Sequence, residues 1–553
     1  MLAWLLACEP DVVTPPRQDA DDTGGRVDCD GDGCGFDATN ECQDHDTDEN
    51  SPDLPEVCDG KDNDCDGAVD EGVTVSLHGD ADGDGFGDPA TATEGCPGDP
   101  GIEDGTDCDD ADAGTFPGGS EVWGDGVDQD CDGVADGADV TNAAVFLPGE
   151  HAGDSVVAVA TGDLDGDGDD DLVVTACGRS EWWGKVYVLL GPVSGDDTLS
   201  SAEGHVAGTE SSPVGCAVAV AGDVDGDGNS DILVGAAPSF GGWESSDGSG
   251  AWLLSGPALG LDSTDEATLL LTPDGPADAA GVAVAAGDVN GDGTPDLIVG
   301  ATLADEGAPD GGAAYVVFGP RDGTLELADA DVTVTGQTAS GLVGASVRAD
   351  ADFDGDGLSD VVIGGPREGG AELPGHVSVF FDPALGTHAT SDADVRLEGA
   401  RYDSAFGRAS AAGDLDDDGL ADLVVGETGV NGGMVDVYPG PLAKGQEPAS
   451  RVYGSAPTGA LGTSVAVLPG TRRIVAGAPA EEGGKVYVFE NLAPGTWTED
   501  AAIARWVDPT WPDYAGQRVA TGDLDGDGLA DVLFGGSGYA DESGAIWGFL
   551  ARR

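Results

Sequence analysis

The chain has 553 residues, with 20 Lys and Arg against 108 Asp and Glu, which gives a formal net charge of −88. A charge of this sign and size excludes most nucleic-acid-binding functions, because such proteins neutralise phosphates. The 94 Gly residues disfavour long helices, while the 39% of hydrophobic residues can form a sizeable core. The composition therefore predicts a mostly β protein.

The chain begins with a short apolar leader, residues 1–8, that ends in Leu5-Leu6-Ala7-Cys8. This ending resembles the lipobox of bacterial lipoproteins, in which the Cys is lipidated. The leader lacks the basic residues of a signal peptide, so a misplaced start codon and an accidental Cys are the alternatives. We expect an exported protein, either a cell-surface or outer-membrane lipoprotein or a secreted one. The sequence contains no stretch of about 20 apolar residues, so it predicts no membrane-spanning helix.

Residues 9–27 are polar and rich in Pro, Asp and Thr, and we expect them to form a flexible tether. Residues 28–140 contain eight of the eleven Cys residues, much Asp and few β-branched residues. Such a segment cannot bury a conventional core, so we expect disulfides and bound ions to hold it. Structural zinc is disfavoured, because no paired CxxC motifs occur.

Two stretches of this region share a Cys- and Asp-rich pattern, CDGKDNDCDG from Cys58 and GTDCDD from Gly105. They resemble the Cys-rich metal-binding repeat of surface proteins related to MopE, over about residues 28–137. The second copy has Trp123 where the first has Cys58, which leaves its disulfide pattern open. The resemblance also implies copper as an alternative ion, although His45 and His78 lie among hard carboxylates, which copper does not favour.

From residue 141 onward, short strand-like runs alternate with acidic loops that begin at Asp163, Asp223, Asp288, Asp352, Asp414 and Asp523. The first four intervals are 60, 65, 64 and 62 residues, whereas the last is 109. The long interval contains one more unit, between Leu461 and Pro479, in which a Pro-Gly turn and two Arg residues replace the acidic loop. The chain therefore has seven repeated units.

Each unit predicts four strands, as in the radial blade of a β-propeller. In unit one these include residues 155–160, residues 172–175 and a run from Gly184, and a fourth run precedes the next unit. The last unit lacks a fourth run, while AAVFLPG from Ala143 stands unassigned before unit one. We predict that this run is the outer strand of the last blade. The expected fold is all-β, with a seven-bladed β-propeller of four-stranded blades over residues 141–553, preceded by a small disulfide- and calcium-stabilised loop-rich region.

The repeated units resemble FG-GAP repeats, which are the blades of the integrin-α-type β-propeller. Phe406-Gly407 matches the FG element literally, and Gly235-Ala236-Ala237-Pro238 and Gly477-Ala478-Pro479 match the GAP element. The resemblance covers roughly residues 141–553. It implies a propeller used for recognition of a protein or a glycan.

The six acidic loops have carboxylates or Asn at positions 1, 3, 5 and 9, Gly at position 6 and a variable residue at position 7. Ca²⁺ takes six to eight hard oxygen ligands and needs such a Gly turn, and position 7 would supply its backbone carbonyl. Mg²⁺ is less suited, because it prefers an octahedral shell with retained water. An Asp-Gly turn that binds nothing is the alternative. The predicted ligands are Asp163, Asp165, Asp167, Asp169 and Asp171; Asp223, Asp225, Asp227, Asn229 and Asp231; Asp288, Asn290, Asp292, Thr294 and Asp296; Asp352, Asp354, Asp356, Leu358 and Asp360; Asp414, Asp416, Asp418, Leu420 and Asp422; and Asp523, Asp525, Asp527, Leu529 and Asp531.

The N-terminal region repeats the same spacing three times, which predicts about three calcium ions there in addition to about six in the propeller. These ligands are Asp62, Asp64, Asp66 and Asp70; Asp80, Asp82, Asp84 and Asp88; and Asp128, Asp130, Asp132 and Asp136. The unit between Leu461 and Pro479 should bind no ion. Two Cys residues lie in the propeller, and we predict that a Cys177–Cys216 disulfide joins its first two blades, with two small buried apolar residues as the alternative.

No GxSxG, HExxH or GxxxxGK[ST] motif occurs in the chain, so no catalytic motif supports an enzyme. We predict a calcium-binding bacterial cell-surface or secreted protein that acts as a non-enzymatic recognition or adhesion module. A calcium-dependent polysaccharide or phosphoester hydrolase or lyase is the alternative. The expected partner is a protein or glycan, not nucleic acid, with membrane contact only through the lipid anchor. Its predicted binding residues are Trp182, Trp183, Trp243, Trp511 and Tyr514, unless each ring packs on its own blade.

Overall fold

The computed structural model describes Cys58, Asp70, residues 72–117, 119, 127–129, 131, 137–139 and most of 143–551. Within the last range it leaves out residues 152–155, 178–182, 194, 196, 210–213, 237–248, 274, 276–277, 369–373, 402–403, 430–431, 482–483, 491, 508–513 and 539–542. The chain forms two compact units. The first lies within Met1–Ser120 and Gln129–Cys131, and the second within Glu121–Asp128 and Asp132–Arg553.

The described part of the first unit consists mostly of loops. Strand β1 (Val75–Leu77) pairs antiparallel with β2 (Thr93–Gly95), and one 3-10 helix, η2 (Pro89–Thr91), precedes β2. Disulfides join Cys58 to Cys96 and Cys108 to Cys131. Covalent links substitute for a core here, as the composition predicted. Cys29, Cys34, Cys42 and Cys65 lie outside the described residues.

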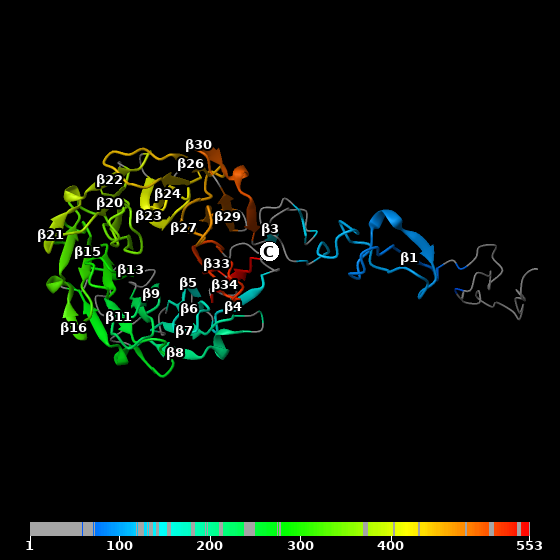
Figure 1. Cartoon of the computed structure of the whole chain (residues 1–553), viewed down its shortest axis with the longest axis horizontal. Helices are drawn as coiled ribbons and strands as arrows, with labels where there is room; N and C mark the ends of the chain where they lie inside the picture. The colour runs from blue at the N-terminus through cyan, green and yellow to red at the C-terminus, as the bar shows by residue number, and fades with distance from the viewer. Residues whose placement is uncertain are drawn as a thin grey trace, which may run out of the picture. The chain divides into compact units, whose positions relative to one another are not determined.

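The second unit is a seven-bladed β-propeller, with the blades arranged in a ring (Figure 1). The blades contain, in order, β5 (Val156–Gly162), β6 (Asp171–Ala176), β7 (Lys185–Leu189) and β8 (Gly204–Ala207); β9 (Ala217–Gly222), β10 (Asp231–Gly235), β11 (Ala251–Leu254) and β12 (Leu269–Thr272); β13 (Ala280–Gly287), β14 (Asp296–Ala301), β15 (Ala313–Val317) and β17 (Val332–Thr335); β18 (Ser346–Arg348), β19 (Val361–Gly365), β20 (His376–Phe380) and β22 (Val395–Glu398); β23 (Ser404–Gly413), β24 (Asp422–Gly429), β25 (Met434–Tyr438) and β26 (Ser450–Tyr453); β27 (Ser464–Val467), β28 (Arg473–Ala478), β29 (Lys485–Glu490) and β31 (Ala504–Val507); and β32 (Arg518–Gly522), β33 (Asp531–Gly536), β34 (Ala545–Phe549) and β4 (Val145–Pro148).

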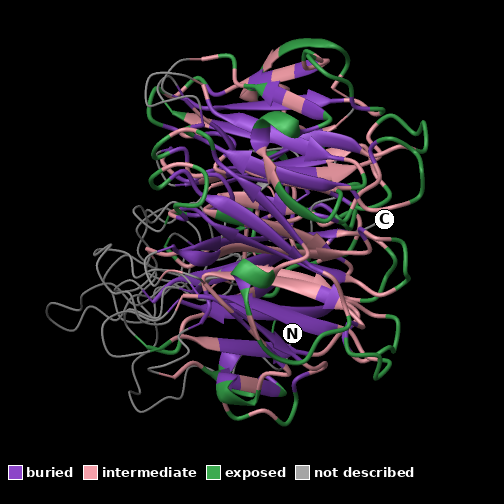
Figure 2. Cartoon of the chain, turned by 90° about the vertical axis from the view of Figure 1, so that its left-hand side faces the viewer, coloured by how far each residue is buried: buried purple, intermediate pink, exposed green. Residues whose placement is uncertain are grey.

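Burial explains why these short runs become strands. All six residues of β6 are buried, because a strand in the middle of a blade is covered on both faces by neighbouring blades. Its β-branched residues suit such a surface. Val173 of blade one packs with Ile232 and Val234 of blade two in one hydrophobic cluster, so the core lies between the sheets. Figure 2 shows these buried strands, with the exposed residues concentrated in the connecting loops.

The ring closes as the sequence predicted. Strand β4 pairs antiparallel with β34, with Phe146 opposite Trp547 and Leu147 opposite Ile546. Val145 and Leu147 are fully buried in this position. The run before unit one is therefore the outer strand of the last blade, and residues from both ends of the unit share one sheet.

Four blades carry a fifth strand that the sequence did not predict. It lies outside the fourth strand and pairs with it in parallel: β16 (Gly323–Glu326) with β12, β21 (Gly386–Ala389) with β17, β30 (Gly495–Thr498) with β26, and β3 (Gly137–Asp139) with β31. Most residues of β16 are exposed, since its contact is through the backbone. Short 3-10 helices precede fourth strands of the blades: η4 (Leu199–Ser201), η5 (Thr264–Glu266), η6 (Leu327–Asp329), η7 (Thr390–Asp392) and η8 (Glu499–Ala501). Three of them, η6, η7 and η8, directly follow the fifth strands β16, β21 and β30.

A disulfide joins Cys177 to Cys216, which confirms the predicted link between blades one and two. Cys177 directly follows β6, and Cys216 directly precedes β9. Their Cα atoms are 5.1 Å apart. The two strands run in opposite directions, so these ends meet on the face of the ring away from the acidic loops.

Candidate metal centres

Each of the six acidic loops of the propeller joins the first strand of a blade to its second strand. In blade one the loop occupies residues 163–170, between β5 and β6. Hairpin connections at equivalent places in successive blades lie on one face of the ring. All six loops are therefore presented together, as the repeat predicted.

Side-chain hydrogen bonds fix the conformation of the blade-one loop. Asp163 accepts from the backbone N–H of Gly166 through Oδ1 at 2.7 Å, and from Gly168 through Oδ2 at 3.2 Å. Asp165 and Asp167 each accept from the N–H two residues later, at 3.2 and 3.0 Å. Such Asx turns arrange carboxylates on alternate residues around a common centre. Gly166 and Gly168 have φ values of 80° and 100°, which a side chain would strain.

The position-9 carboxylate connects the loop to the core of the blade. Asp171 is 1% exposed. Its Oδ2 accepts from Leu164 N at 2.7 Å, and its Oδ1 accepts from Gly191 N at 2.7 Å. The equivalent bond from position 2 to position 9 recurs as Val224–Asp231, Val289–Asp296, Phe353–Asp360, Leu415–Asp422 and Leu524–Asp531.

Three carboxylates of the blade-one loop converge. The potential ligand atoms of Asp163, Asp165 and Asp171 all lie within 4.8 Å of one another. Hard oxygen donors at this spacing can enclose a divalent cation, and without one the like charges repel. The loop geometry thus suits the predicted calcium ligands, and the donor set contains no sulfur or imidazole.

Burial raises the pKa of the position-9 carboxyls above the ordinary range. The pKa reaches about 6 for Asp231 and Asp296, and about 7 for Asp360. The pKa of Asp531 also reaches about 7. In each case loss of hydration is the main cause, and charges of neighbouring Asp residues in the same loop add to it. A bound cation would oppose both effects.

Neighbouring loops are hydrogen-bonded to one another around this face. Ser230 N, at position 8 of the second loop, donates to Leu164 O of the first loop at 3.2 Å. Ser359 N and Ala421 N, also at position 8, donate to the position-1 carbonyl oxygens of Asp288 and Asp352, each at 3.1 Å. At the junction of blades seven and one, Asp523 N donates to Asp170 Oδ2 at 2.9 Å. Sequence spacing within one loop gave no signal for these contacts between loops.

The structure describes only some of the remaining predicted site residues. Trp183, at the start of the segment before β7, is 44% exposed, and Tyr514, before β32, is 39% exposed. Trp182, Trp243 and Trp511 lie outside the described residues, so the predicted aromatic patch stays a prediction. Cys8, Asp62, Asp64, Asp66, Asp130, Asp132 and Asp136 also lie outside them.

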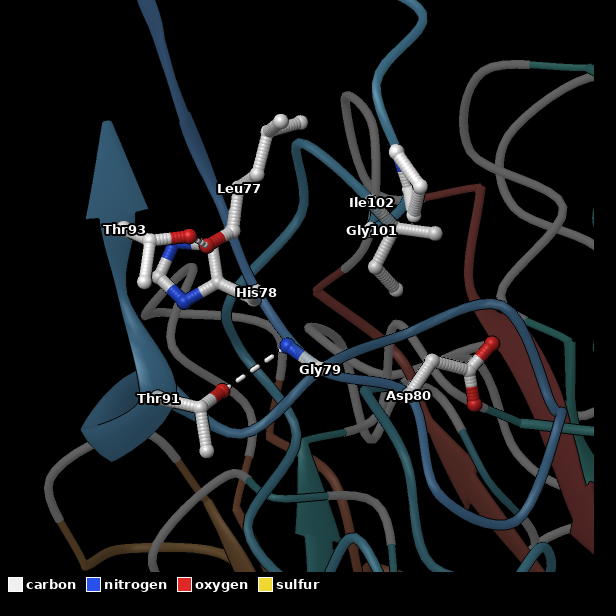
Figure 3. Close-up of a pocket in the computed structure, with 9 residues that line it drawn as sticks. Leu77, His78, Gly79, Asp80, Thr91, Thr93, Gly101 and Ile102 are labelled. Carbon is white, nitrogen blue, oxygen red and sulfur yellow. Dashed lines mark hydrogen bonds between the residues drawn. The ribbon is translucent and has the colours of Figure 1, made fainter. Parts of the chain in front are cut away.

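In the first unit, His78 lines a pocket with Leu77, Asp80 and Ile102 (Figure 3). Its Nδ1 lies 3.1 Å from Asp88 O, and its Nε2 lies 3.4 Å from Ser76 Oγ. Both ring nitrogens therefore have oxygen neighbours within the chain. This environment does not favour His78 as a copper ligand.

Sequence comparisons match these features. The FG-GAP repeat model matches residues 280–317, and the FG-GAP-like repeat model matches residues 163–234. The propeller carries FG-GAP repeats. The Cu-binding_MopE model, which describes a metal-binding motif, matches residues 42–71 and 107–137 in the N-terminal region.

Curated proteins with similar sequences include integrins and a phospholipase. Human integrin alpha-IIb is 33% identical over 236 residues, which is 40% of this chain and 20% of that protein. Integrin alpha-5 of Xenopus laevis is 32% identical over 163 residues, 28% of this chain and 15% of that protein. Bovine phosphatidylinositol-glycan-specific phospholipase D is 36% identical over 148 residues, 26% of this chain and 17% of that protein. The match spans a fifth or less of each of these relatives.

Proposed function

We propose that the chain is an extracellular, non-enzymatic recognition module whose FG-GAP propeller binds six calcium ions, one in each acidic loop. The convergence of Asp163, Asp165 and Asp171 is the observation that carries this proposal. The repeated Asx turns support it, because a preorganised loop loses little entropy when an ion binds. About three further ions would bind in the N-terminal region.

An extracellular location agrees with several features. Disulfides are typical of oxidising compartments, and both units contain them. The relatives include integrins. Among the residues that the structure describes, no helix has the length and apolar character needed to cross a membrane. We propose that lipidation of Cys8 anchors the chain to a bacterial surface, with secretion as the alternative.

For the recognition surface we propose the face opposite the acidic loops. On this face the segment entering a blade contacts the turn between the second and third strands of the preceding blade, as in the bridges of Gly312 with Val343 and Gly433 with Leu461. Trp183 and Tyr514 lie in such segments and are exposed. Exposed aromatic rings suit a sugar or protein partner.

The similarity to a phospholipase supports an enzyme as the second candidate. The match covers 17% of the bovine protein, and this sequence contains no GxSxG, HExxH or GxxxxGK[ST] motif. We therefore rank a calcium-dependent hydrolase or lyase below recognition. Turnover of polysaccharides or phosphoesters that disappears when the protein is unfolded would reverse this ranking.

The ion proposal is tested by counting calcium and measuring stability. Protein dialysed against millimolar CaCl₂ should retain about six propeller ions by mass spectrometry of the metal. Removal of the ions should lower the melting temperature, since each site saturated at 100 times its Kd contributes about 2.7 kcal/mol. Asp171→Asn should remove one ion, whereas Asp329→Asn, in the 3-10 helix η6, should remove none. No bound calcium and an unchanged melting curve would refute the proposal.

The recognition proposal is tested separately on glycan and protein arrays. Trp183→Ala should weaken binding to any array hit at least tenfold while the melting temperature stays constant. Leu385→Ala is the matched control, because Leu385 is 72% exposed but lies beside the outer strand β21. Equal loss of binding in both variants would place the binding surface elsewhere.

A further inference from the structure

Another loop with the same spacing lies in the described part of the first unit, at residues 80–88. Gly83 N donates to Asp80 Oδ1 at 2.7 Å, Asp84 N to Asp82 Oδ1 at 3.3 Å, and Phe86 N to Asp84 Oδ1 at 2.9 Å. These are the turn bonds of the propeller loops. The carboxylates at positions 1, 3 and 5 are therefore arranged in the same way.

The position-9 residue of this loop has a different role from its propeller counterparts. Asp88 is the N-cap of η2, and its Oδ1 accepts from Ala90 N at 2.6 Å. In the propeller, the N–H at position 2 donates to position 9. Here the equivalent N–H, from Ala81, donates instead to Asp110 Oδ1 at 2.8 Å. A carboxylate distant in sequence thus takes the structural place of position 9.

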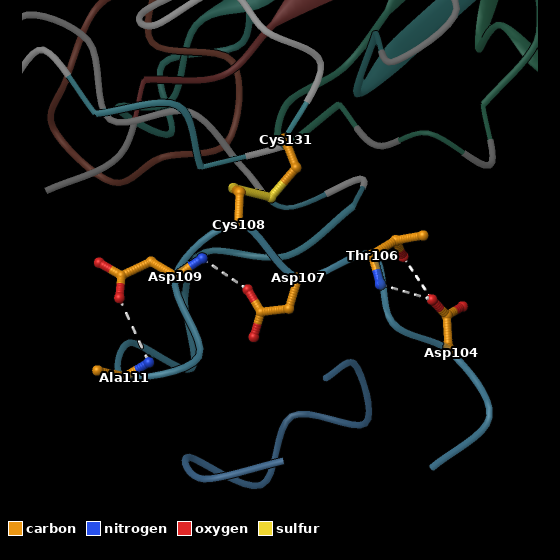
Figure 4. The surroundings of a disulfide bond; sticks show 7 residues. All are labelled: Asp104, Thr106, Asp107, Cys108, Asp109, Ala111 and Cys131. Atoms are coloured by element: carbon orange, nitrogen blue, oxygen red, sulfur yellow. Dashed lines mark hydrogen bonds between the residues drawn. A yellow bond between two sulfur atoms is a disulfide. The ribbon is translucent and has the colours of Figure 1, made fainter. Parts of the chain in front are cut away.

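Asp107 brings a second carboxylate to the same loop. Its side chain is 2% exposed, and its Oδ1 accepts from Asp109 N at 2.8 Å (Figure 4). Its Oδ2 is buried and has no hydrogen-bond partner among the described residues. The same holds for Oδ2 of Asp82 and of Asp84. A buried carboxylate oxygen without a partner is costly, so three of them together call for a bound cation.

Carboxylate oxygens of the loop lie close to those of Asp107 and Asp110 in two overlapping groups. The potential ligand atoms of Asp82, Asp84 and Asp107 lie within 4.8 Å of one another, and so do those of Asp80, Asp82 and Asp110. Asp82 belongs to both groups, which makes them parts of one cluster. Burial raises the pKa of Asp107, and the charges of Asp84, Asp82 and Asp110 raise it further.

The loop of residues 80–88 packs closely against the segment that contains Asp107. Asp107 N donates to Gly87 O at 3.2 Å, and the rings of Phe86 and Phe116 stack with their centroids 5.4 Å apart. Gly87 has no room for a side chain, because a Cβ there would lie 2.8 Å from His78 Cβ and 2.9 Å from Gly79 O. The disulfide of Cys108 with Cys131 fixes the residue next to Asp107.

We propose that Asp80, Asp82, Asp84, Asp107 and Asp110 form one composite divalent-cation site, which calcium occupies. The all-oxygen donor set and its mixture of near and distant ligands suit the flexible coordination of calcium. Asp88 is not a ligand of this site. The ion would fasten the loop of residues 80–88 to the start of the metal-binding motif at residues 107–137, independently of the propeller sites.

Terbium luminescence can isolate this site in the full-length chain. Tb³⁺ replaces calcium in oxygen sites, and Phe86→Trp introduces a sensitiser at position 7 of the loop. The signal is the emission of the Phe86→Trp protein minus that of the unsubstituted protein, which removes the contribution of the native Trp residues. We expect a saturable difference signal that CaCl₂ displaces at lower concentration than MgCl₂.

Asn substitutions in the Phe86→Trp background then assign the ligands. Asp107→Asn should weaken Tb³⁺ binding at least tenfold, because it removes one ligand charge while its Oδ1 still accepts from Asp109 N. Asp88→Asn is the matched control and should leave the affinity unchanged. Unreduced peptide mapping should show the Cys108–Cys131 disulfide in both. If the Asp107→Asn protein lacks that disulfide, the Asp110→Asn protein is measured instead. It should also bind Tb³⁺ at least tenfold more weakly while keeping the disulfide.

Three results would overturn the proposal. The first is the absence of a difference signal at any Tb³⁺ concentration. The second is unchanged affinity in a correctly disulfide-bonded Asp107→Asn protein, and the third is loss of affinity in Asp88→Asn alone. Stronger displacement by MgCl₂ than by CaCl₂ would overturn the assignment to calcium. None of these outcomes depends on whether the propeller loops bind ions.

Discussion

Arg472, in the short turn of blade six, pairs with Asp417 in the acidic loop of blade five, and its Nε donates to Asp417 Oδ2 at 2.8 Å. Asp417 occupies position 4, where the other five acidic loops have Gly. The turn of blade six has no carboxylate, and it contacts the acidic loop of blade five through the positively charged side chain of Arg472. In the turn of blade six the positive charge is a guanidinium, whereas we propose that the equivalent loop of each other blade holds a calcium ion.

We predict that Arg472→Gln leaves the number of calcium ions in the propeller at six. The turn at residues 468–473 has no carboxylate, so removal of the cation cannot create a site. The melting temperature should fall only slightly, and less at high salt, because the pair is exposed and screened. Calcium counting and melting curves in low and high NaCl measure both effects. Anomalous calcium density beside residue 472, before or after the substitution, would contradict this prediction.

The metal-free propeller should become less stable as the pH rises from about 4 to 7. The pKa of Asp360 and Asp531 is about 7 in the folded protein, against about 3.9 in an unfolded chain. Over that interval the folded state binds more protons, so the free energy of unfolding falls with pH and levels off above 7. Calcium requires the ionised form, so its stabilisation should grow over the same range.

Melting temperatures of protein stripped on a chelating resin, measured at pH 5, 6.5 and 8 with and without calcium, test this pH dependence. Asp360→Asn serves as the control, since it removes one of the titrating groups and should flatten the slope. A melting temperature of the stripped protein that stays constant or rises with pH would show that these carboxyls do not titrate as described.

The ion pair between Arg451 and Asp436 should be a large contributor to the stability of blade five. Arg451 Nε and Nη2 donate to the two Asp436 oxygens at 2.6 and 2.7 Å, and Asp436 is fully buried. Arg451→Leu leaves that buried carboxylate with only the 3.4 Å hydrogen bond from the Tyr438 hydroxyl, so we expect a loss of about 3 kcal/mol in the free energy of unfolding. Arg321→Leu breaks the more exposed pair with Asp331 and should cost about 1 kcal/mol or less. Equal losses of unfolding free energy for Arg451→Leu and Arg321→Leu, measured by denaturant unfolding, would refute this prediction.

Removal of the Cys177–Cys216 disulfide should destabilise the junction of the first two blades. The cysteines are 39 residues apart in sequence, and a loop of that size corresponds to about 4 kcal/mol of unfolded-chain entropy. We expect the double variant Cys177→Ser/Cys216→Ser to melt at a lower temperature than the oxidised protein. Its propeller transition should match that of the protein reduced with a phosphine, which also breaks the two disulfides of the first unit. Detection of both thiols free in unreduced peptides would remove the basis of the prediction.

The repeat spacing was sufficient to predict the blades, because each unit alternates buried runs with Gly- and Asp-rich turns. It also predicted β4, since one apolar run was left over before unit one and one blade lacked a strand. The fifth strands, such as β16, could not be predicted. Their residues are mostly exposed and have no apolar alternation, and backbone pairing with β12 is what orders them.

The candidate sites divide in the same way. Spacing within one loop predicts carboxylates that converge locally, as Asp163 and Asp165 do. It places Asp88 at position 9 but gives no indication that Asp107 and Asp110 meet the same loop, because that meeting depends on the fold of the first unit. A periodic motif reports ligands within its own turn and says nothing of a ligand about 25 residues away.

The chain joins the ring through two edge strands in succession. β3 pairs with the outer strand of blade six, and β4 then forms the outer strand of blade seven. Each is the last strand of its sheet in the described part of the chain. If the protein is held from its N-terminal side, a pulling force reaches these two ladders before any strand of the blade interiors. We expect β4 to set the mechanical strength of the closed ring, because its detachment would leave blade seven without its outer strand.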